Sequence, residues 1–325
     1  MRDHGGNIDA AVSRHGGTLA EWIDLSTGIN RVPYPLPELP PEVWTMLPTR
    51  SAQAALIEAA RQAWGTRAPM LALAGAQGAI QMIPRLGRPG RARVLAPTYN
   101  EHAAALRAAG WQVEEVPALA DLAGADLAVV VNPNNPDGRQ HPPAELQALL
   151  ERVGRLVVDE SFGDMTPGIS LTPQAGRAGL LVLRSFGKFY GLAGLRLGFV
   201  LGGAAEIAAL AEMAGPWPVS GAALAIGTRA LGDTAWAEAT TRRLAGEAPR
   251  LDALAERAGW TPRGGSTLFR LYDTPQAAAA QEALARHRIW SRRFPYSDRW
   301  LRLGLPGTPA EWDRLTTALE SLHAV

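Results

Sequence analysis

The sequence predicts an α/β fold, with a large domain built on a doubly wound, mostly parallel sheet and a smaller α+β domain at the C-terminus. Three observations support this prediction. The chain has 325 residues, its apolar fraction of 47% is ordinary for a globular protein, and short apolar runs alternate with helical patterns. Continuous apolar runs are typical of strands buried on both faces, and their alternation with helices is typical of parallel sheets.

The alternation is clearest between residues 46 and 218, the expected large domain. The expected strands are 93–96, 127–131, 156–159, 180–183 and 197–201. The expected helices are 52–64, 101–109, 143–152 and 204–213. Because ligands of open α/β sheets bind at the carboxyl ends of the strands, residues that follow these strands are the first candidates for a site.

Prolines mark both limits of this domain. Prolines recur between positions 33 and 41 and forbid a long helix, so residues 1–45 are expected to form an extended arm that packs with the small domain and the active site. Pro216 and Pro218 end the large domain. Residues 219–325 are expected to contain a long helix over 220–259 and a small domain with the order helix, strand, helix, strand, helix.

Composition excludes several classes of function. Lys and Arg number 32 against 31 Asp and Glu, so no basic field is available for nucleic acid. The chain has no cysteine, which excludes disulfides, thiolate catalysis and cysteine-based metal sites, and we expect no metal. We expect no membrane span, because no stretch of 18 apolar residues occurs, and no secretory leader, because residues 1–7 are polar. A cytoplasmic protein is therefore expected.

The strongest chemical signal is residues 184–199, R-S-F-G-K-F-Y-G-L-A-G-L-R-L-G-F, directly after an expected strand. This segment closely resembles the cofactor-lysine motif of the fold-type I pyridoxal 5'-phosphate (PLP) enzymes, the class I/II aminotransferase superfamily. The resemblance implies that Lys188 binds PLP covalently and that Ser185 and Arg196 hold its phosphate. A hydroxyl and a guanidinium suit a dianionic phosphate. The alternative is a glycine-rich turn with a solvated lysine.

Residues 132–138, N-P-N-N-P-D-G, resemble the N-P-x-N-P-x-G loop of the same superfamily. The resemblance implies that Asn135 donates to the 3'-oxygen of PLP and meets the substrate carboxylate. Asp137 replaces the usual threonine. An ordinary Asn/Pro/Gly turn is the alternative.

Asp159 ends an apolar strand, where a carboxylate without a cation would be poorly solvated. By resemblance it pairs with the pyridinium nitrogen and keeps the ring an electron sink. The alternative is a helix cap. The superfamily often has tyrosine three residues later, but Phe162 stands there and cannot bind the 3'-oxygen, which leaves that contact to Asn135.

Two weaker signals complete the expected cofactor site. Gly75, Ala76 and Gln77 open a helical run, and backbone N–H groups at a helix start bind phosphate. Tyr99 matches the aromatic residue that stacks on the PLP ring in the superfamily. An ordinary helix start and a core tyrosine are the alternatives. We count Lys188, Asp159, Asn135 and Tyr99 as the catalytic candidates.

The substrate is expected to contact residues near both ends of the chain. Arg302 lies on an expected strand and resembles the arginine that clamps the substrate α-carboxylate; an edge-strand arginine is the alternative. His4-Gly5-Gly6-Asn7, with the stretch 24–30 that ends at Asn30, resembles the threonine-phosphate decarboxylase family of cobalamin biosynthesis.

That second resemblance implies decarboxylation of L-threonine O-3-phosphate to (R)-1-amino-2-propanol O-2-phosphate. Glycine N–H groups and a protonated histidine would suit the substrate phosphate. The segment 15–17 repeats His-Gly-Gly, and spacing does not choose between the two copies, although Asn7 favours His4. The alternative is an N-terminus that is merely polar. Preference for phosphothreonine over phosphoserine cannot be read from these residues.

Two rival functions remain open. A histidinol-phosphate-like aminotransferase would share the same core. A non-catalytic PLP-fold protein is the second rival, but Lys188, Asp159, Asn135 and Arg196 are all present. Because members of the superfamily are homodimers, we expect a homodimer, with Tyr34 as a candidate contribution to the partner's site.

Overall fold

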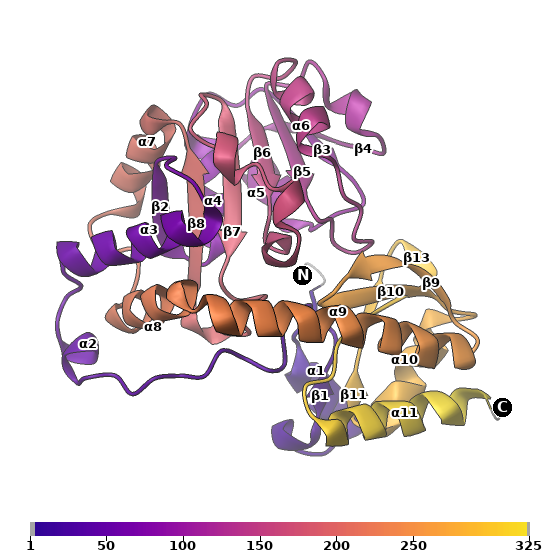
Figure 1. Cartoon of the computed structure of the whole chain (residues 1–325). Helices are drawn as coiled ribbons and strands as arrows, with labels where there is room; N and C mark the ends of the chain where they lie inside the picture. The colour runs from indigo at the N-terminus through magenta and orange to yellow at the C-terminus, as the bar shows by residue number, and fades with distance from the viewer. Residues whose placement is uncertain (1–3, 324–325) are drawn as a thin grey trace. The chain divides into compact units, whose positions relative to one another are not determined.

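The computed structural model describes residues 4–323 and divides into two compact units (Figure 1). The large unit comprises Tyr34–Asn135 and Arg139–Glu238, and the small unit comprises the chain up to Pro33, Pro136–Gly138 and the chain from Ala239 onward. The sequence placed the limits at residues 45 and 218. The structure assigns residues 34–45 and 219–238 to the large unit.

The large unit contains a seven-stranded sheet with the order β2-β8-β7-β6-β5-β3-β4. Its strands are β2 (Met70–Ala74), β3 (Arg91–Leu95), β4 (Gln112–Val116), β5 (Leu127–Val131), β6 (Leu156–Asp159), β7 (Leu180–Ser185) and β8 (Leu197–Gly202). Strand β8 is antiparallel to β2 and β7, and the other neighbouring pairs are parallel. The predicted mostly parallel sheet is therefore confirmed.

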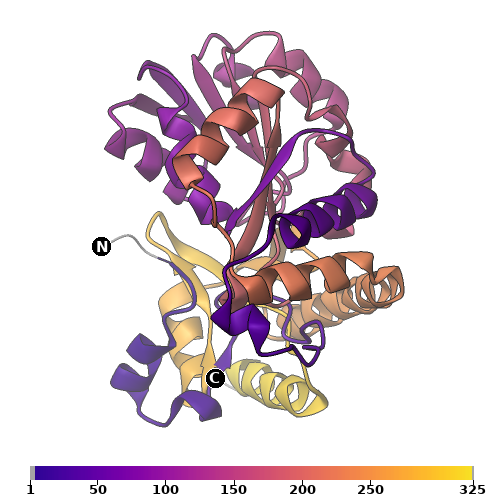
Figure 2. The ribbon, with the colours of Figure 1, turned by 90° about the vertical axis from the view of Figure 1, so that its left-hand side faces the viewer.

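Helices cover both faces of this sheet, as expected for a doubly wound fold (Figure 2). On one face Ile80, Leu106 and Leu210 pack into a core with Val129 and Leu183. On the other face the Trp64 ring lies 4.9 Å from the Phe199 ring. The helices of this unit are α2 (Glu42–Thr45), α3 (Arg50–Trp64), α4 (Ala76–Met82), α5 (Glu101–Ala108), α6 (Pro143–Leu150), α7 (Ala204–Ala214) and α8 (Gly221–Gly232).

The single helix expected over 220–259 is wrong, because the chain forms two helices there. Helix α8 ends at Gly232, and α9 spans Thr234–Arg257. The side chain of Asp233 accepts a hydrogen bond from the backbone N–H of Trp236 at 3.0 Å. This contact begins a new helix without a proline.

The small unit is built on a four-stranded antiparallel sheet with the order β12-β13-β10-β9. Its strands are β9 (Thr261–Ser266), β10 (Phe269–Asp273), β12 (Arg292–Phe294) and β13 (Ser297–Gly304), and its helices include α10 (Ala277–Arg286) and α11 (Pro309–His323). The Arg250 guanidinium of α9 lies 4.2 Å from the centre of the Trp312 ring of α11. One expected strand is thus replaced by a β9–β10 hairpin and the other by a β12–β13 pair.

The N-terminal segment is not extended throughout, contrary to the expectation for residues 1–45. Helix α1 spans Ile8–His15, and β1 (Ile23–Asp24) pairs in parallel with β11 (Ile289–Trp290). The prolines that forbid a helix begin only at Pro33, which leaves residues 8–15 able to form one.

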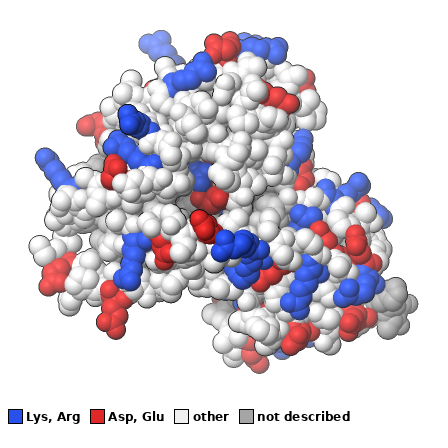
Figure 3. All heavy atoms as spheres, in the orientation of Figure 1, with Lys and Arg blue, Asp and Glu red and all other residues white. Residues whose placement is uncertain are grey.

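Positive and negative side chains are interspersed on the face of the molecule shown in Figure 3. Within residues 4–323, no helix has the length and apolar character needed to cross a membrane.

Candidate active site

A cavity of about 140 Å³ lies in the large unit at the carboxyl ends of β5, β6 and β7. Every cofactor residue predicted from the sequence lines it. These residues are Gly75, Ala76, Gln77, Tyr99, Asn135, Asp159, Ser185, Lys188 and Arg196. Strand ends from one parallel sheet bring together segments that lie far apart in sequence, which explains the convergence. We call this space the cofactor cavity.

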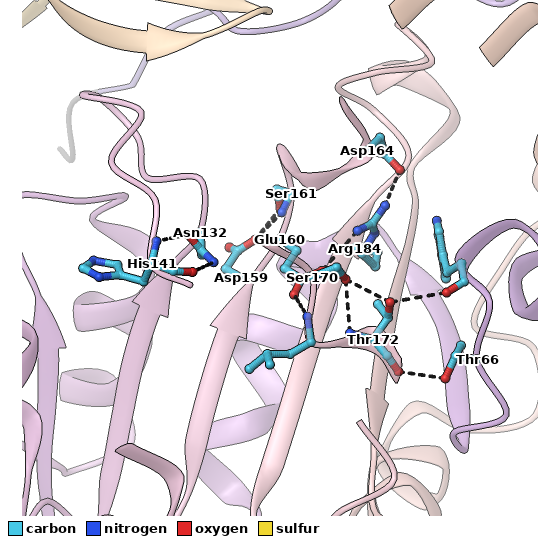
Figure 4. Close-up of polar contacts among 12 residues, drawn as sticks. Thr66, Asn132, His141, Asp159, Glu160, Ser161, Asp164, Ser170, Thr172 and Arg184 are labelled. Atoms are coloured by element: carbon cyan, nitrogen blue, oxygen red, sulfur yellow. Dashed lines mark hydrogen bonds and ion pairs between the residues drawn. The ribbon is translucent and has the colours of Figure 1, made fainter. Parts of the chain in front are cut away.

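Asp159 is a buried carboxylate that lines the cofactor cavity, with 2% of its surface exposed. Its Oδ2 lies 2.8 Å from Nε2 of His102. Its Oδ1 accepts from the backbone N–H of Ser161 at 2.9 Å and from the Ser161 hydroxyl at 2.5 Å (Figure 4). Burial raises the pKa of Asp159, but the contacts with His102 and Ser161 outweigh it and hold this pKa below its ordinary value. The carboxylate therefore stays charged at neutral pH.

His102 is a functional candidate that sequence reasoning missed. It lies on α5, is buried, and contacts Asp159 from the helix that follows Tyr99. The rings of His102 and Tyr99 form an edge contact with centres 6.2 Å apart. The available signal was a histidine on the same face of the expected helix as Ala105 and Leu106, where a polar side chain needs a partner.

We predict that His102→Phe destabilises the protein by about 1–3 kcal/mol, because it removes a hydrogen bond to a buried carboxylate. In the wild type, the stability contributed by the lowered Asp159 pKa is complete above the ordinary aspartate pKa and is lost as the pH falls through the folded value. In His102→Phe, His102 no longer lowers the pKa of Asp159, so this stability is lost at a higher pH than in the wild type. Denaturant unfolding measured from pH 3 to 8 checks this, and His102→Gln, which keeps a donor, is the control. Equal unfolding free energies for His102→Phe and the wild type would contradict the assignment.

The turn that carries Lys188 is closely packed. The ring of Phe186 stacks on that of Tyr190 with centres 4.2 Å apart. A Cβ at Gly187 would lie 3.0 Å from the Cα of Ala193, so glycine is favoured there. Nζ of Lys188 lies 5.6 Å from the centre of the Phe162 ring. The residue that replaces the usual tyrosine therefore gives the lysine an apolar neighbour.

Arg196 and the start of α4 form one end of the cavity. Arg196 has a left-handed backbone (φ 54°), and its Nη1 donates to the Ala193 carbonyl at 3.0 Å. Gly75 has φ 76°, and a Cβ there would lie 2.8 Å from Nη2 of Arg196. A Cβ at Gly198 would lie 2.2 Å from the backbone nitrogen of Ala76. These glycines let a guanidinium and a helix start approach each other, a combination that suits an anion.

The small unit holds a separate cavity of about 570 Å³. His4 and Asn7 line it, as do Arg14, Arg292 and Arg293. Asp298 also lines it, so four basic side chains face one acidic one. We call this space the arginine cavity. Its arginines were not predicted from the sequence, although the adjacent pair Arg292-Arg293 was a usable signal, and the structure places both on β12.

The two glycines after His4 pack against Ser26 of the small unit. A Cβ at Gly5 would lie 2.3 Å from the Ser26 carbonyl oxygen, and the N–H of Gly6 donates to the Ser26 hydroxyl at 2.7 Å. The buried Arg302 donates from Nη2 to the Ser26 carbonyl at 2.6 Å. Burial, with a smaller contribution from Arg292, lowers the pKa of Arg302 to about 10. Ser26 thus connects the His4 segment to Arg302.

The two His-Gly-Gly segments have different surroundings. His4 lines the arginine cavity, whereas His15 ends α1 with its ring 5.9 Å from that of Trp22 and 6.1 Å from that of Trp290. His15 is therefore part of a packed aromatic cluster. Asn30 is also buried, and its side chain accepts from Arg243 at 2.8 Å and from the backbone N–H of Val32 at 3.1 Å. These contacts give Asn30 a role within the small unit.

Comparison with known proteins identifies the family to which the chain belongs. The family model Aminotransferase class I and II matches residues 41–319. Threonine-phosphate decarboxylases from Pseudomonas aeruginosa and Sinorhizobium sp are 46% and 45% identical, over 98% of this chain and 97% and 98% of theirs. Histidinol-phosphate aminotransferase from Symbiobacterium thermophilum is 34% identical over 70% of this chain and 66% of its own.

Among solved structures, the fold matches histidinol-phosphate aminotransferase from Sinorhizobium meliloti in complex with pyridoxal-5'-phosphate. The TM-score is 0.80 at 22% identity, and the match covers 100% of this chain and 95% of that one. At this identity the likeness concerns the fold alone. The chain belongs to the aminotransferase class I and II family, and within it to the group of the threonine-phosphate decarboxylases.

Proposed function

We propose that the large unit binds PLP in the cofactor cavity. The residues fit this group: Asp159 offers a buried negative charge to a protonated ring nitrogen, and Lys188 offers an amine to an aldehyde. Ser185 and Arg196, with the start of α4, offer donors to a phosphate. When bound, PLP supplies an aldehyde that combines with amines and a ring that withdraws electrons. The observation that supports this assignment most strongly is that one cavity holds both the charged Asp159 and Lys188.

The reaction that we propose is decarboxylation of L-threonine O-3-phosphate to (R)-1-amino-2-propanol O-2-phosphate. Full-length similarity to proteins named threonine-phosphate decarboxylase supports it, since the relative named as an aminotransferase matches a smaller share of the chain. In this reaction the bond between Cα and the carboxylate breaks, and its electron pair stays at Cα. A proton must then be added to Cα, and we assign that transfer to Nζ of Lys188.

The other residues of the large unit orient the reacting groups in this proposal. Asn135 would hold the 3'-oxygen of PLP and the substrate carboxylate, and Tyr99 would contact the ring, since both residues line the cofactor cavity. Asp159 retains its charge because His102 and Ser161 donate to it, so the electron-withdrawing form of the ring is maintained. The family resemblance and the shared cavity support these roles.

The small unit recognises the acidic ends of the substrate. We assign the substrate phosphate to the arginine cavity, where His4 and Asn7 lie with Arg14, Arg292 and Arg293. Guanidinium groups bind phosphate oxygens in pairs, which suits a dianion. Arg302 is assigned to the α-carboxylate. Gly5, Gly6 and Asn30 support the shape of this region through their contacts with Ser26 and Arg243.

Product analysis tests the proposed function. The purified protein with PLP is incubated with L-threonine O-3-phosphate, and separately with histidinol phosphate and 2-oxoglutarate. We expect the aminopropanol phosphate from the first mixture and no glutamate from the second. Glutamate formation from histidinol phosphate, without aminopropanol phosphate in the first mixture, would instead establish an aminotransferase.

We predict that His4→Ala raises KM for L-threonine O-3-phosphate about tenfold to a hundredfold, the size expected for losing a charged hydrogen bond. PLP binding should stay unchanged, since His4 lines the arginine cavity and not the cofactor cavity. Steady-state kinetics check this. His15→Ala is the matched control, because His15 begins the second His-Gly-Gly segment but packs between Trp22 and Trp290. An equal rise in KM for both variants would contradict the assignment to His4.

We further propose a homodimer that works in the cytoplasm as part of cobalamin biosynthesis. Large apolar side chains are exposed on residues 36–47 of the large unit, including Leu36 (67%), Trp44 (68%) and Leu47 (64%). A patch of this kind favours association with a second copy. Substrate and product both carry a charged phosphate, which prevents them from crossing a lipid bilayer. Both compounds therefore stay in the compartment where they are made, and a cytoplasmic location suits the reaction.

A further inference from the structure

A cluster of charged side chains, most of it buried, lies at the ends of β6 and β7 (Figure 4). Nη1 of Arg184 donates to Oε2 of Glu160 at 3.1 Å, and Nη2 of Arg184 donates to Asp164. Arg184 is 3% exposed and Glu160 is 1% exposed. We call these three residues the Arg184 cluster. Among the described residues that line the cofactor cavity, none belongs to it.

Glu160 also anchors the irregular segment that follows β6. Its Oε2 accepts from the Ser170 hydroxyl at 2.5 Å, and its Oε1 accepts from the backbone N–H of Leu171 at 2.6 Å. The Ser170 hydroxyl in turn contacts Thr172, whose carbonyl accepts from the Thr66 hydroxyl at 2.7 Å (Figure 4). Glu160 therefore connects the end of β6 to the loop after it and to the segment between α3 and β2.

Burying the charges of Arg184 and Glu160 is costly, and replacing such groups with apolar residues often leaves stability unchanged or improves it. Stability alone therefore does not explain the Arg184 cluster. A buried ionic group can instead select one arrangement of the backbone around it. The Arg184 cluster links the end of β6, the end of β7 and the loop that follows β6, and so holds them in one arrangement.

The register of β6 and β7 matters because Glu160 and Arg184 are each adjacent in sequence to a residue that lines the cofactor cavity. Glu160 follows Asp159, and Arg184 precedes Ser185. Asp159 is paired with Leu183, and the N–H of Glu160 donates to the Leu183 carbonyl at 2.9 Å. Successive side chains of a strand point in opposite directions. Asp159 and Ser185 therefore reach the cavity while Glu160 and Arg184 point away from it.

We propose that Glu160 and Arg184 are positioning residues, whose buried ion pair fixes the ends of β6 and β7 so that Asp159 and Ser185 meet PLP together. This inference rests on the proposed binding of PLP. The pair acts through Asp159 and Ser185 and does not touch the cofactor. Loss of this ion pair lets Asp159, which contacts the ring, shift relative to Ser185, which contacts the phosphate. We therefore expect its loss to weaken PLP binding more than it lowers the stability of the fold.

The test compares Glu160→Gln with Asp164→Asn. Both variants remove one of the two carboxylates beside Arg184 and leave it one charged partner, but only Glu160 adjoins a cavity residue. We expect Glu160→Gln to raise the PLP dissociation constant about tenfold, the equivalent of about 1.4 kcal/mol, and Asp164→Asn to change it less than about threefold. In the PLP-free proteins, hydrogen exchange of the amides at 159–161 and 183–185 should quicken in Glu160→Gln and not in Asp164→Asn.

The possible outcomes separate the two proposals. Equal PLP affinity in Glu160→Gln and the wild type, or equal weakening in both variants, would overturn the positioning role while leaving PLP binding intact. A wild type that does not bind PLP would overturn the proposed function and this inference with it. If Glu160→Gln does not fold, Arg184→Lys replaces it, since a lysine keeps the charge but loses the fork that contacts both carboxylates. Wild-type PLP affinity in folded Arg184→Lys would equally overturn the positioning role.

Discussion

Lys188→Ala is expected to lower the rate of CO₂ release from L-threonine O-3-phosphate by about a thousandfold or more, within the range seen when a proton-transfer group is lost. The variant loses the amine that we assign to covalent PLP binding and to protonation at Cα. Its fold should be retained, because Lys188 is only half-buried and the turn is held by the Phe186–Tyr190 stack and Gly187. Kinetics at saturating PLP check this prediction.

The sequence allows a specific chemical control for Lys188→Ala. Lys188 is the only lysine of the 325-residue chain, so borohydride reduction with PLP has one side-chain amine to label. Peptide mass mapping should find the reduced adduct at Lys188 in the wild type and no side-chain adduct in Lys188→Ala. Partial rescue of the variant by added methylamine would support the amine's role. A variant with wild-type turnover would refute it.

Asp159→Asn should lower kcat about a hundredfold to a thousandfold, the size typical of removing one group that stabilises developing charge. Asparagine fills the same space, but it brings no negative charge to hold a proton on the ring nitrogen. PLP should still be retained by Lys188, Ser185 and Arg196, so the variant keeps its visible absorbance. The loss should therefore appear in turnover rather than in cofactor content.

Asp126→Asn provides the matched control for this change. Asp126 precedes β5 at the amino end of the same sheet, where its Oδ2 accepts from the backbone N–H of Arg91 at 2.7 Å. The substitution is chemically identical but lies away from the cofactor cavity, so kcat should not change. If Asp159→Asn turned over at the wild-type rate, Asp159 would not be the ring carboxylate.

The interior of the large sheet could be predicted from sequence because its strands are short, continuous apolar runs. The limits of β5 and β6 were predicted without error, since both strands are apolar runs buried on both faces and β6 ends at its single polar residue, Asp159. The edge strands β2 and β4 were missed. Strand β4 reads Q-V-E-E-V, as suits a strand with one free edge, and β2 reads M-L-A-L-A, a composition that favours helix over strand.

The cofactor cavity was predictable to a similar degree because its residues follow strands. Lys188, Asp159 and Ser185 follow or end strands of one sheet, so their chain positions already place them together. His102 was not predictable in this way, because it reaches Asp159 from the middle of a helix. The arginine cavity depends on α1 and β12 converging in the small unit, a tertiary arrangement that leaves no periodic pattern.

The most direct test of the account is release of CO₂ by the wild-type protein. It is mixed with PLP and L-threonine O-3-phosphate, with no keto acid present, and CO₂ and amine are quantified together. We predict catalytic turnover with equal amounts of CO₂ and aminopropanol phosphate. Turnover that appears only when a keto acid is added, with the amino group transferred to it and no CO₂ released, would contradict the central claim.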